Sequence, residues 1–79
     1  MKYYTLTETV INDTETMTLL KMDSQDKCDL VNTFQLRRQM LLNSTDVRVI
    51  KDNFDESFIS VMTDDGNIIN LSIIETTMV

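Results

Sequence analysis

Only one stretch of this chain has the residue spacing of an amphipathic helix, over about 24–42, and segments with the two-residue period of β-strands flank it. Two strands are predicted before it, within 2–22. Three more are predicted after it, at 46–51, 56–63 and 67–77. Because 79 residues form one domain with one core, the sequence predicts a single small α+β domain over 1–79, of order ββαβββ.

A single helix can cover only one face of a five-stranded sheet, so we expect an antiparallel sheet with the helix packed on one face. Asp23 or Ser24 is predicted to cap this helix. Its apolar stripe is expected to consist of Leu30, Val31, Phe34, Leu41 and Leu42. The sheet side of the core is expected to include Leu6, Leu19, Val49, Phe58 and Leu71.

The strongest turn signal in the chain is segment 64–67, in which Gly66 permits the positive φ of a tight hairpin turn. We predict a two-residue turn about Asp65 and Gly66. Such a turn sets the register of the last two strands. One face would then carry Phe58, Ser60, Met62, Ile69, Leu71 and Ile73.

The sheet face opposite the helix is expected to carry apolar residues that the helix does not cover. Leu36 and Met40 form a further apolar pair on the outer side of the helix. The predicted dimer or docking residues are Leu36, Met40, Ile50, Ile59, Val61, Ile68 and Ile74. Domains under about 80 residues without disulfides or metals often gain buried area by self-association. A homodimer is therefore predicted, and docking of a foreign protein is the alternative.

Acidic residues outnumber basic residues by 13 to 7, which gives a net charge of −6. A nucleic-acid binder needs clustered Lys and Arg, so direct binding of DNA or RNA is not expected. No segment approaches the roughly 18 to 20 apolar residues of a membrane span. The first residues also lack the apolar block of a signal peptide. The sequence therefore predicts a cytoplasmic protein with no membrane partner.

Catalysis is not expected, because the chain contains no histidine and its only bases are carboxylates and lysines. The acidic segments 52–56 and 64–67 lack the ligand spacing of a calcium loop. A single cysteine, Cys28, excludes an internal disulfide. We therefore predict a non-enzymatic protein with no cofactor and no metal site.

Acidic residues are predicted to gather at both ends of the sheet, because antiparallel strands bring successive turns together there. The first acidic rim, preferred as the partner-binding site, consists of Asp52, Asp55, Glu56, Asp23 and Asp26. The second acidic rim consists of Asp64, Asp65, Asp13 and Glu15. Capping and turn preferences account for most of these residues individually. Together they create negative surfaces that attract a protein partner with a basic cleft.

The length, the acidity and the lack of catalytic residue types resemble those of small inhibitors that bacteriophages and mobile elements encode against host nucleases, defence complexes or toxins. Some inhibitors of this class imitate the charge of nucleic acid. The resemblance is compositional and covers no motif, so it transfers no functional residue. It implies an acidic anti-defence inhibitor that acts through protein–protein interaction. A self-associating structural or adaptor subunit is the alternative.

Overall fold

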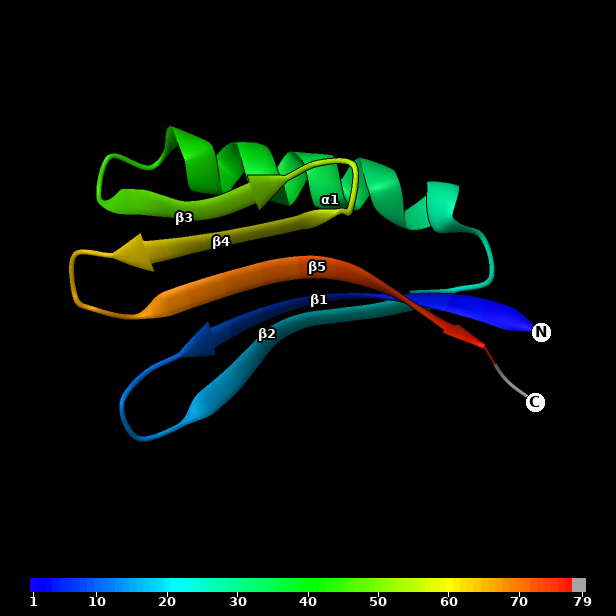
Figure 1. The fold of residues 1–79 in the computed structure, drawn as a ribbon, viewed down its shortest axis with the longest axis horizontal. Coiled ribbons are helices and arrows are strands. Elements are labelled where there is room, and N and C mark those ends of the chain that lie inside the picture. The colour runs from blue at the N-terminus through cyan, green and yellow to red at the C-terminus, as the bar shows by residue number, and fades with distance from the viewer. Residues whose placement is uncertain (78–79) are drawn as a thin grey trace.

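The computed structural model describes residues 1–77, and within them the chain forms five strands and one helix (Figure 1). The elements are β1 (Lys2–Ile11), β2 (Thr16–Ser24), α1 (Lys27–Asn43), β3 (Val47–Asn53), β4 (Phe58–Thr63) and β5 (Ile68–Thr77). This order confirms the predicted ββαβββ arrangement and the α+β class.

All five strands form one antiparallel sheet in the order β2-β1-β5-β4-β3. β5 pairs with β1 from Lys2 opposite Thr77 to Ile11 opposite Ile68, so the first and last strands lie side by side near the centre of the sheet. The outer strands β2 and β3 are therefore its edges. α1 connects one edge to the other and packs on one face of the sheet, as the sequence predicts (Figure 1).

α1 begins later than predicted, because β2 continues through Ser24, which pairs with Tyr4 of β1. Asp26, and not Asp23 or Ser24, is the N-cap of the helix. Its Oδ1 atom accepts a hydrogen bond from the Cys28 backbone N–H at 3.0 Å. This bond satisfies a donor that the first helical turn leaves without an intrahelical partner, and the negative charge is favourable at that end of the helix dipole.

The core lies between α1 and the covered face of the sheet. Leu30 and Phe34 are buried on α1 and confirm the centre of the predicted stripe. Leu6 and Leu71 oppose them from the central strands β1 and β5, also as predicted. The buried apolar residues are Leu6, Leu30, Phe34, Ile59, Val61, Leu71 and Ile73. Burial of one such side chain contributes about 1.5–3 kcal/mol, so this cluster is a main source of stability.

The orientation of β4 differs from the prediction. Ile59 and Val61 are fully buried in the core, so their assignment to an exposed docking surface is wrong. The cause is the length of the β4–β5 turn. The Thr63 backbone N–H donates to the Asn67 carbonyl at 2.8 Å, which leaves three residues in the turn where two were expected. A shift of register by one residue turns every side chain of a strand to the other face.

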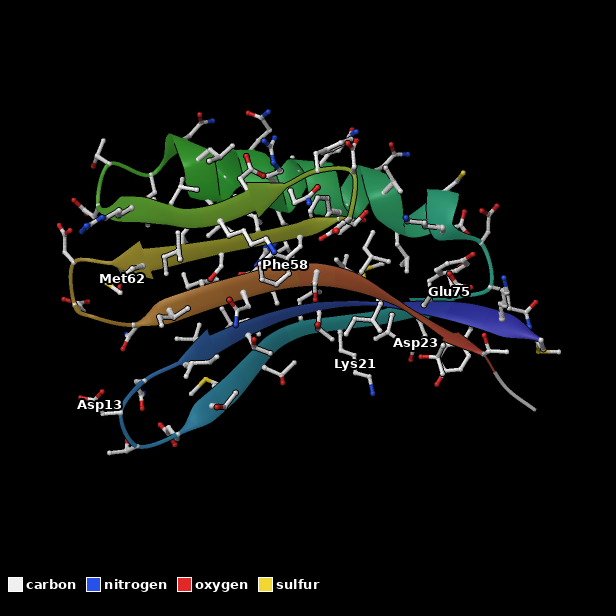
Figure 2. The ribbon with its side chains drawn as sticks, viewed as in Figure 1. Asp13, Lys21, Asp23, Phe58, Met62 and Glu75 are labelled. Atoms are coloured by element: carbon white, nitrogen blue, oxygen red, sulfur yellow. The ribbon has the colours of Figure 1, made fainter. Side chains whose placement is uncertain are left out.

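The open face, which is the sheet face opposite α1, is consequently more polar than predicted. Phe58, expected in the core, lies on this face together with Met62 (Figure 2). Between them, the Ser60 hydroxyl donates a 2.6 Å hydrogen bond to Asn70 Oδ1 of β5. The central rows of this face consist of Thr5, Thr7, Thr9, Ser60, Asn70 and Ser72. Hydroxyl and amide groups of this kind are readily solvated, so the centre of the open face is a poor site for a dry interface.

Each edge strand contains a bulge. Leu19 in β2 and Ile50 in β3 are extra residues without a paired residue on the neighbouring strand. Leu19 and Val49 were predicted in the core but are 50% and 45% exposed. The β2 bulge places Leu20 instead of Leu19 opposite Glu8, and Leu20 packs against the core. The bulges, together with Lys21 and Lys51, interrupt the backbone hydrogen-bonding groups at the two edges, to which a strand from another molecule would pair. The sheet edges are therefore protected against strand addition.

Gly66 occupies the position in the β4–β5 turn that favours glycine, because its φ of 87° lies in the left-handed region. Gly66→Ala should lower the free energy of unfolding by about 1 kcal/mol, since this conformation is unfavourable for a residue with a Cβ atom. A Cβ atom here meets no other atom within 4 Å, so the loss comes from the backbone alone. Gly66→Asn should lose less, because asparagine tolerates this conformation. Urea unfolding checks the order, and an alanine variant as stable as the wild-type chain would contradict it.

Candidate functional site

The residues of the second acidic rim gather at one end of the molecule. The β1–β2 turn, the β4–β5 turn and the α1–β3 connection all lie at one end, on the left in Figure 1. The Asp64 backbone N–H donates a 3.0 Å hydrogen bond to the Asp46 carbonyl there, which joins the β4–β5 turn to the start of β3. This end carries the second acidic rim, and exposed Asp46 lies beside it. The first acidic rim is divided: the β2–α1 connection, with Asp23 and Asp26 beside it, lies toward the other end, whereas the β3–β4 turn lies about midway along the molecule (Figure 1).

Three of the five residues of the first acidic rim already have partners within the fold. Asp52 accepts hydrogen bonds from Arg38 Nε at 2.9 Å and from Nη2 at 2.5 Å. Asp26 caps α1, and Asp23 Oδ1 accepts a 2.6 Å hydrogen bond from the Thr5 hydroxyl. A carboxylate that is neutralised by a bidentate arginine presents less charge to a partner.

The β3–β4 turn, which carries the rest of this rim, is held to the helix by Phe54. The Phe54 ring lies 6.2 Å from the ring of Phe34 and 5.6 Å from the guanidinium carbon of Arg38. Asp55 and Glu56 are exposed in the same turn. Within residues 1–77 their side chains form no ion pair, so the first acidic rim offers two unpaired carboxylates.

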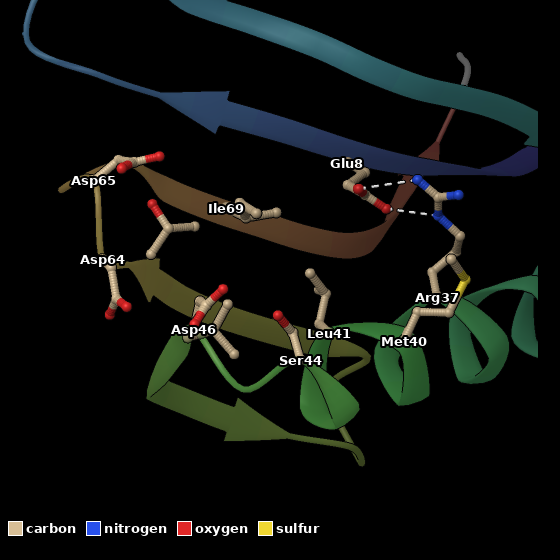
Figure 3. Close-up of a pocket in the computed structure, with 11 residues that line it drawn as sticks. Glu8, Arg37, Met40, Leu41, Ser44, Asp46, Asp64, Asp65 and Ile69 are labelled. Carbon is tan, nitrogen blue, oxygen red and sulfur yellow. Dashed lines mark hydrogen bonds and ion pairs between the residues drawn. The ribbon is translucent and has the colours of Figure 1, made fainter.

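A pocket of about 600 Å³ opens at the end that carries the second acidic rim. Figure 3 shows Asp46, Asp64 and Asp65 on one side of it. All three are exposed, and within the described part of the chain none of them forms an ion pair. Asp13 and Glu15 lie on the neighbouring β1–β2 turn and do not line the pocket. The apolar part of the wall consists of Met40, Leu41, Val47 and Ile69.

An ion pair between β1 and α1 lies on the opposite side of the pocket (Figure 3). Arg37 Nε donates to Glu8 Oε1 at 2.7 Å, and Nη2 donates to Oε2 at 3.0 Å. The Glu8 side chain is 6% exposed and that of Arg37 is 32% exposed. The hydrogen bonds to Glu8 raise the pKa of Arg37, so the guanidinium stays charged. The pair ties the centre of the sheet to the helix.

The sequence-based prediction missed Glu8. This residue alternates with Leu6 and Val10 along β1, so the two-residue period places a carboxylate among core positions. Glutamate is almost never fully buried without a partner. Arg37 lies three residues after Phe34 on the helix and reaches Glu8 from there. A charge at a core position of the strand is the signal that predicts such a pair.

The electrostatic character of the pocket is negative. α1 ends at Asn43 with no basic residue in its last turn, so the partial negative charge of the helix end adds to the three carboxylates. Arg37 contributes a cation to the wall but is neutralised by Glu8. The pocket therefore attracts cationic groups. Among the described residues, no group of three or more His, Cys, Asp or Glu is placed to hold a metal ion.

The predicted docking residues outside the core lie on three different surfaces. Leu36 and Met40 are on the outer side of α1, where they are 63% and 56% exposed. Ile50 is exposed on edge strand β3. Ile68 is half-buried and Ile74 is exposed, both on the open face. The structure thus separates residues that the sequence treated as one docking face.

No protein-family model, curated protein or solved structure matches the chain. Among residues 1–77, no helix has the length and apolar character needed to cross a membrane. Function is therefore inferred from the geometry and charge of the residues described above.

The Glu8–Arg37 pair should be strongly coupled. Arg37→Leu leaves a buried carboxylate without its partner and should lower the free energy of unfolding by about 3 kcal/mol. The double variant Glu8→Leu/Arg37→Leu should recover most of this loss, because an apolar pair avoids the cost of burying charge. Urea unfolding of the two single variants and the double variant measures the coupling. Additive losses in the double variant would contradict a coupled pair.

The Asp52–Arg38 pair should make stability depend on acid pH. Hydrogen bonds from Arg38 lower the pKa of Asp52 below its usual value of 3.8. A lowered folded-state pKa gives stability that is present above the unfolded pKa and is lost as the pH falls through the folded pKa. Asp52→Asn should therefore be less stable than the wild-type chain at neutral pH, and the difference should shrink below about pH 4. Urea unfolding across this range checks it, and a difference that stays constant with pH would contradict it.

Proposed function

We propose that this chain is a non-enzymatic protein-binding module that docks onto a basic protein surface. The observation that carries the proposal is the pocket beside the second acidic rim, where exposed Asp46, Asp64 and Asp65 have no ion-pair partner among the described residues. Three carboxylates at one end of a chain with a net charge of −6 favour a cationic partner.

The partner groups that fit this pocket are lysine and arginine side chains. Each has an apolar stem and a cationic head. The apolar wall, with Leu41, Val47 and Ile69, can contact the stem, and the carboxylates can pair with the head. We therefore place the second acidic rim, together with Asp46, ahead of the first acidic rim as the binding surface. Asp52 of the first acidic rim already has its arginine within the chain.

Basic clefts occur in proteins that bind the phosphates of nucleic acid. A module that fills such a cleft with carboxylates acts as an inhibitor, because it competes with the phosphates. This chemistry is consistent with the compositional resemblance to acidic inhibitors of phages and mobile elements, so we propose an inhibitor of a host nuclease, defence complex or toxin. We propose the cytoplasm as its place of action, where such targets lie.

A self-associating structural or adaptor subunit is the second candidate function. Leu36 and Met40 favour it, because both are large apolar side chains exposed on the helix.

The first test replaces the three pocket carboxylates. A tagged wild-type chain is used to purify its partner from the native host, and the purified pair is then measured by surface plasmon resonance. Asp46→Asn/Asp64→Asn/Asp65→Asn should weaken binding by about 1–3 kcal/mol, mainly through a slower association rate. Raising the salt concentration should weaken wild-type binding and reduce the difference in affinity between the wild-type chain and this variant. The substitutions keep side chains that suit turns, so the fold should be unaffected.

The matched control is Asp55→Asn/Glu56→Gln, which removes the two unpaired carboxylates of the first acidic rim and leaves the Asp52–Arg38 pair intact. This variant should bind nearly as well as the wild-type chain. If it loses binding while the pocket variant keeps it, recognition runs through the first acidic rim. Salt-independent binding of both variants at wild-type affinity would refute the acidic-surface proposal altogether.

A further inference from the structure

The outer face of α1 carries no charged side chain after its first turn. Between Leu30 and Asn43, the exposed residues are Asn32, Gln35, Leu36, Gln39, Met40 and Asn43. We refer to these six residues as the uncharged helix face. One residue in four of the whole chain is charged, so an exposed stretch of this length without charge is unusual for this protein. Depletion of charge and enrichment in large apolar side chains are typical of the centres of protein interfaces.

The absence of charge has a structural cause. Both charged residues of this part of the helix, Arg37 and Arg38, turn toward the sheet and pair with Glu8 and Asp52. The helix therefore directs its cations inward and exposes Leu36 outward, the reverse of what a surface helix normally does.

The accessible surface of the molecule is also larger than expected for a folded monomer of its mass. Its accessible surface is 5368 Å², whereas a folded monomer of 9.2 kDa is expected to expose about 4900 Å². Its extents of 40 × 26 × 17 Å describe a flat body, because one helix layer covers one sheet. A flat domain with one core gains stability when a further layer packs on it.

We propose that the uncharged helix face binds a second copy of this chain, helix against helix, in an antiparallel homodimer. Two copies with a net charge of −6 repel each other, so a self-interface must bring together surfaces without carboxylates. The uncharged helix face meets this condition. Leu36 and Met40 of each copy form the apolar centre, and the surrounding asparagine and glutamine amides can hydrogen-bond across the interface.

The charge distribution also sets the direction of the second helix. The carboxylates of Asp46, Asp64 and Asp65 lie near the C-terminal end of α1. A parallel pair would bring both clusters to the same end and make them repel, whereas an antiparallel pair separates them by the length of the helices. Antiparallel helices also align their dipoles favourably.

The oligomeric state is the primary test. Light scattering of the wild-type chain at about 100 μM should give twice the mass of one chain. Leu36→Glu should give the monomer mass, because it introduces like charges at the centre of the interface. Ile74→Glu is the matched control, since Ile74 is 55% exposed on the open face, and it should stay dimeric. Circular dichroism checks that each variant is folded. If Leu36→Glu does not fold, Leu36→Gln replaces it in the test.

A disulfide test reports the direction of the helices. Cys28 lies ten residues before the midpoint of Leu36 and Met40, which places it about 15 Å along the helix from the centre of the interface. In an antiparallel dimer the two Cys28 residues are too far apart to be bridged, whereas Gln39→Cys in a Cys28→Ser background should crosslink on oxidation. Rapid crosslinking of Cys28 in the wild-type chain would show a parallel pair and overturn the proposed arrangement.

Two results would overturn the dimer itself. The first is a wild-type monomer at the concentration given above. The second is a dimer that Ile74→Glu dissociates and Leu36→Glu does not, which would place the interface on the open face. If the wild-type chain is a monomer and Leu36→Glu loses a foreign partner, the uncharged helix face belongs to that partner. None of these results depends on binding by the second acidic rim, so this proposal and the proposed function can fail separately.

Discussion

The two adjacent arginines of α1 fix how the helix lies on the sheet. Arg37 pairs with Glu8 of β1 at the sheet centre, and Arg38 pairs with Asp52 of edge strand β3. Successive helix residues point about 100° apart, so these bonds together restrict rotation of the helix about its axis. The same rotation directs Leu36 outward. The pocket wall, the pairing of Asp52 in the first acidic rim and the uncharged helix face all follow from this orientation.

The order of elements could be predicted from the sequence because each element carries its own local pattern. The face of β4 that points toward the helix could not be predicted, because it depends on whether the β4–β5 turn has two or three residues. Both a two-residue and a three-residue turn suit a glycine at position 66, since both use a positive φ. The burial of Ile59 and Val61 shows which alternative the core selects: two β-branched side chains fill the space under the helix, and Phe58 and Met62 face outward. Ile59 and Val61 are β-branched whereas Phe58 and Met62 are not, and this difference between the two faces favours the observed register.

The candidate site was predictable in position but not in detail. Strand directions alone placed the turns that carry Asp13, Asp64 and Asp65 at one end, as the structure shows, whereas the β3–β4 turn after Asp52 lies about midway along the molecule (Figure 1). Which carboxylates remain unpaired depends on contacts far apart in the sequence. Asp52 and Arg38 are separated by 14 residues, and only the passage of α1 from β2 to β3 brings them together. The ranking of the two rims therefore required the tertiary structure.

The two proposed surfaces meet at one residue. Met40 is 56% exposed on the uncharged helix face and also lines the pocket beside the second acidic rim. Methionine is flexible and can repack between two contacts, so a dimer partner and a basic side chain in the pocket can each use part of it. The bulged edge strands limit other modes of association. An antiparallel dimer would leave one pocket free at each end, so a single dimer could engage two basic sites, provided that their spacing matches the length of the helix pair.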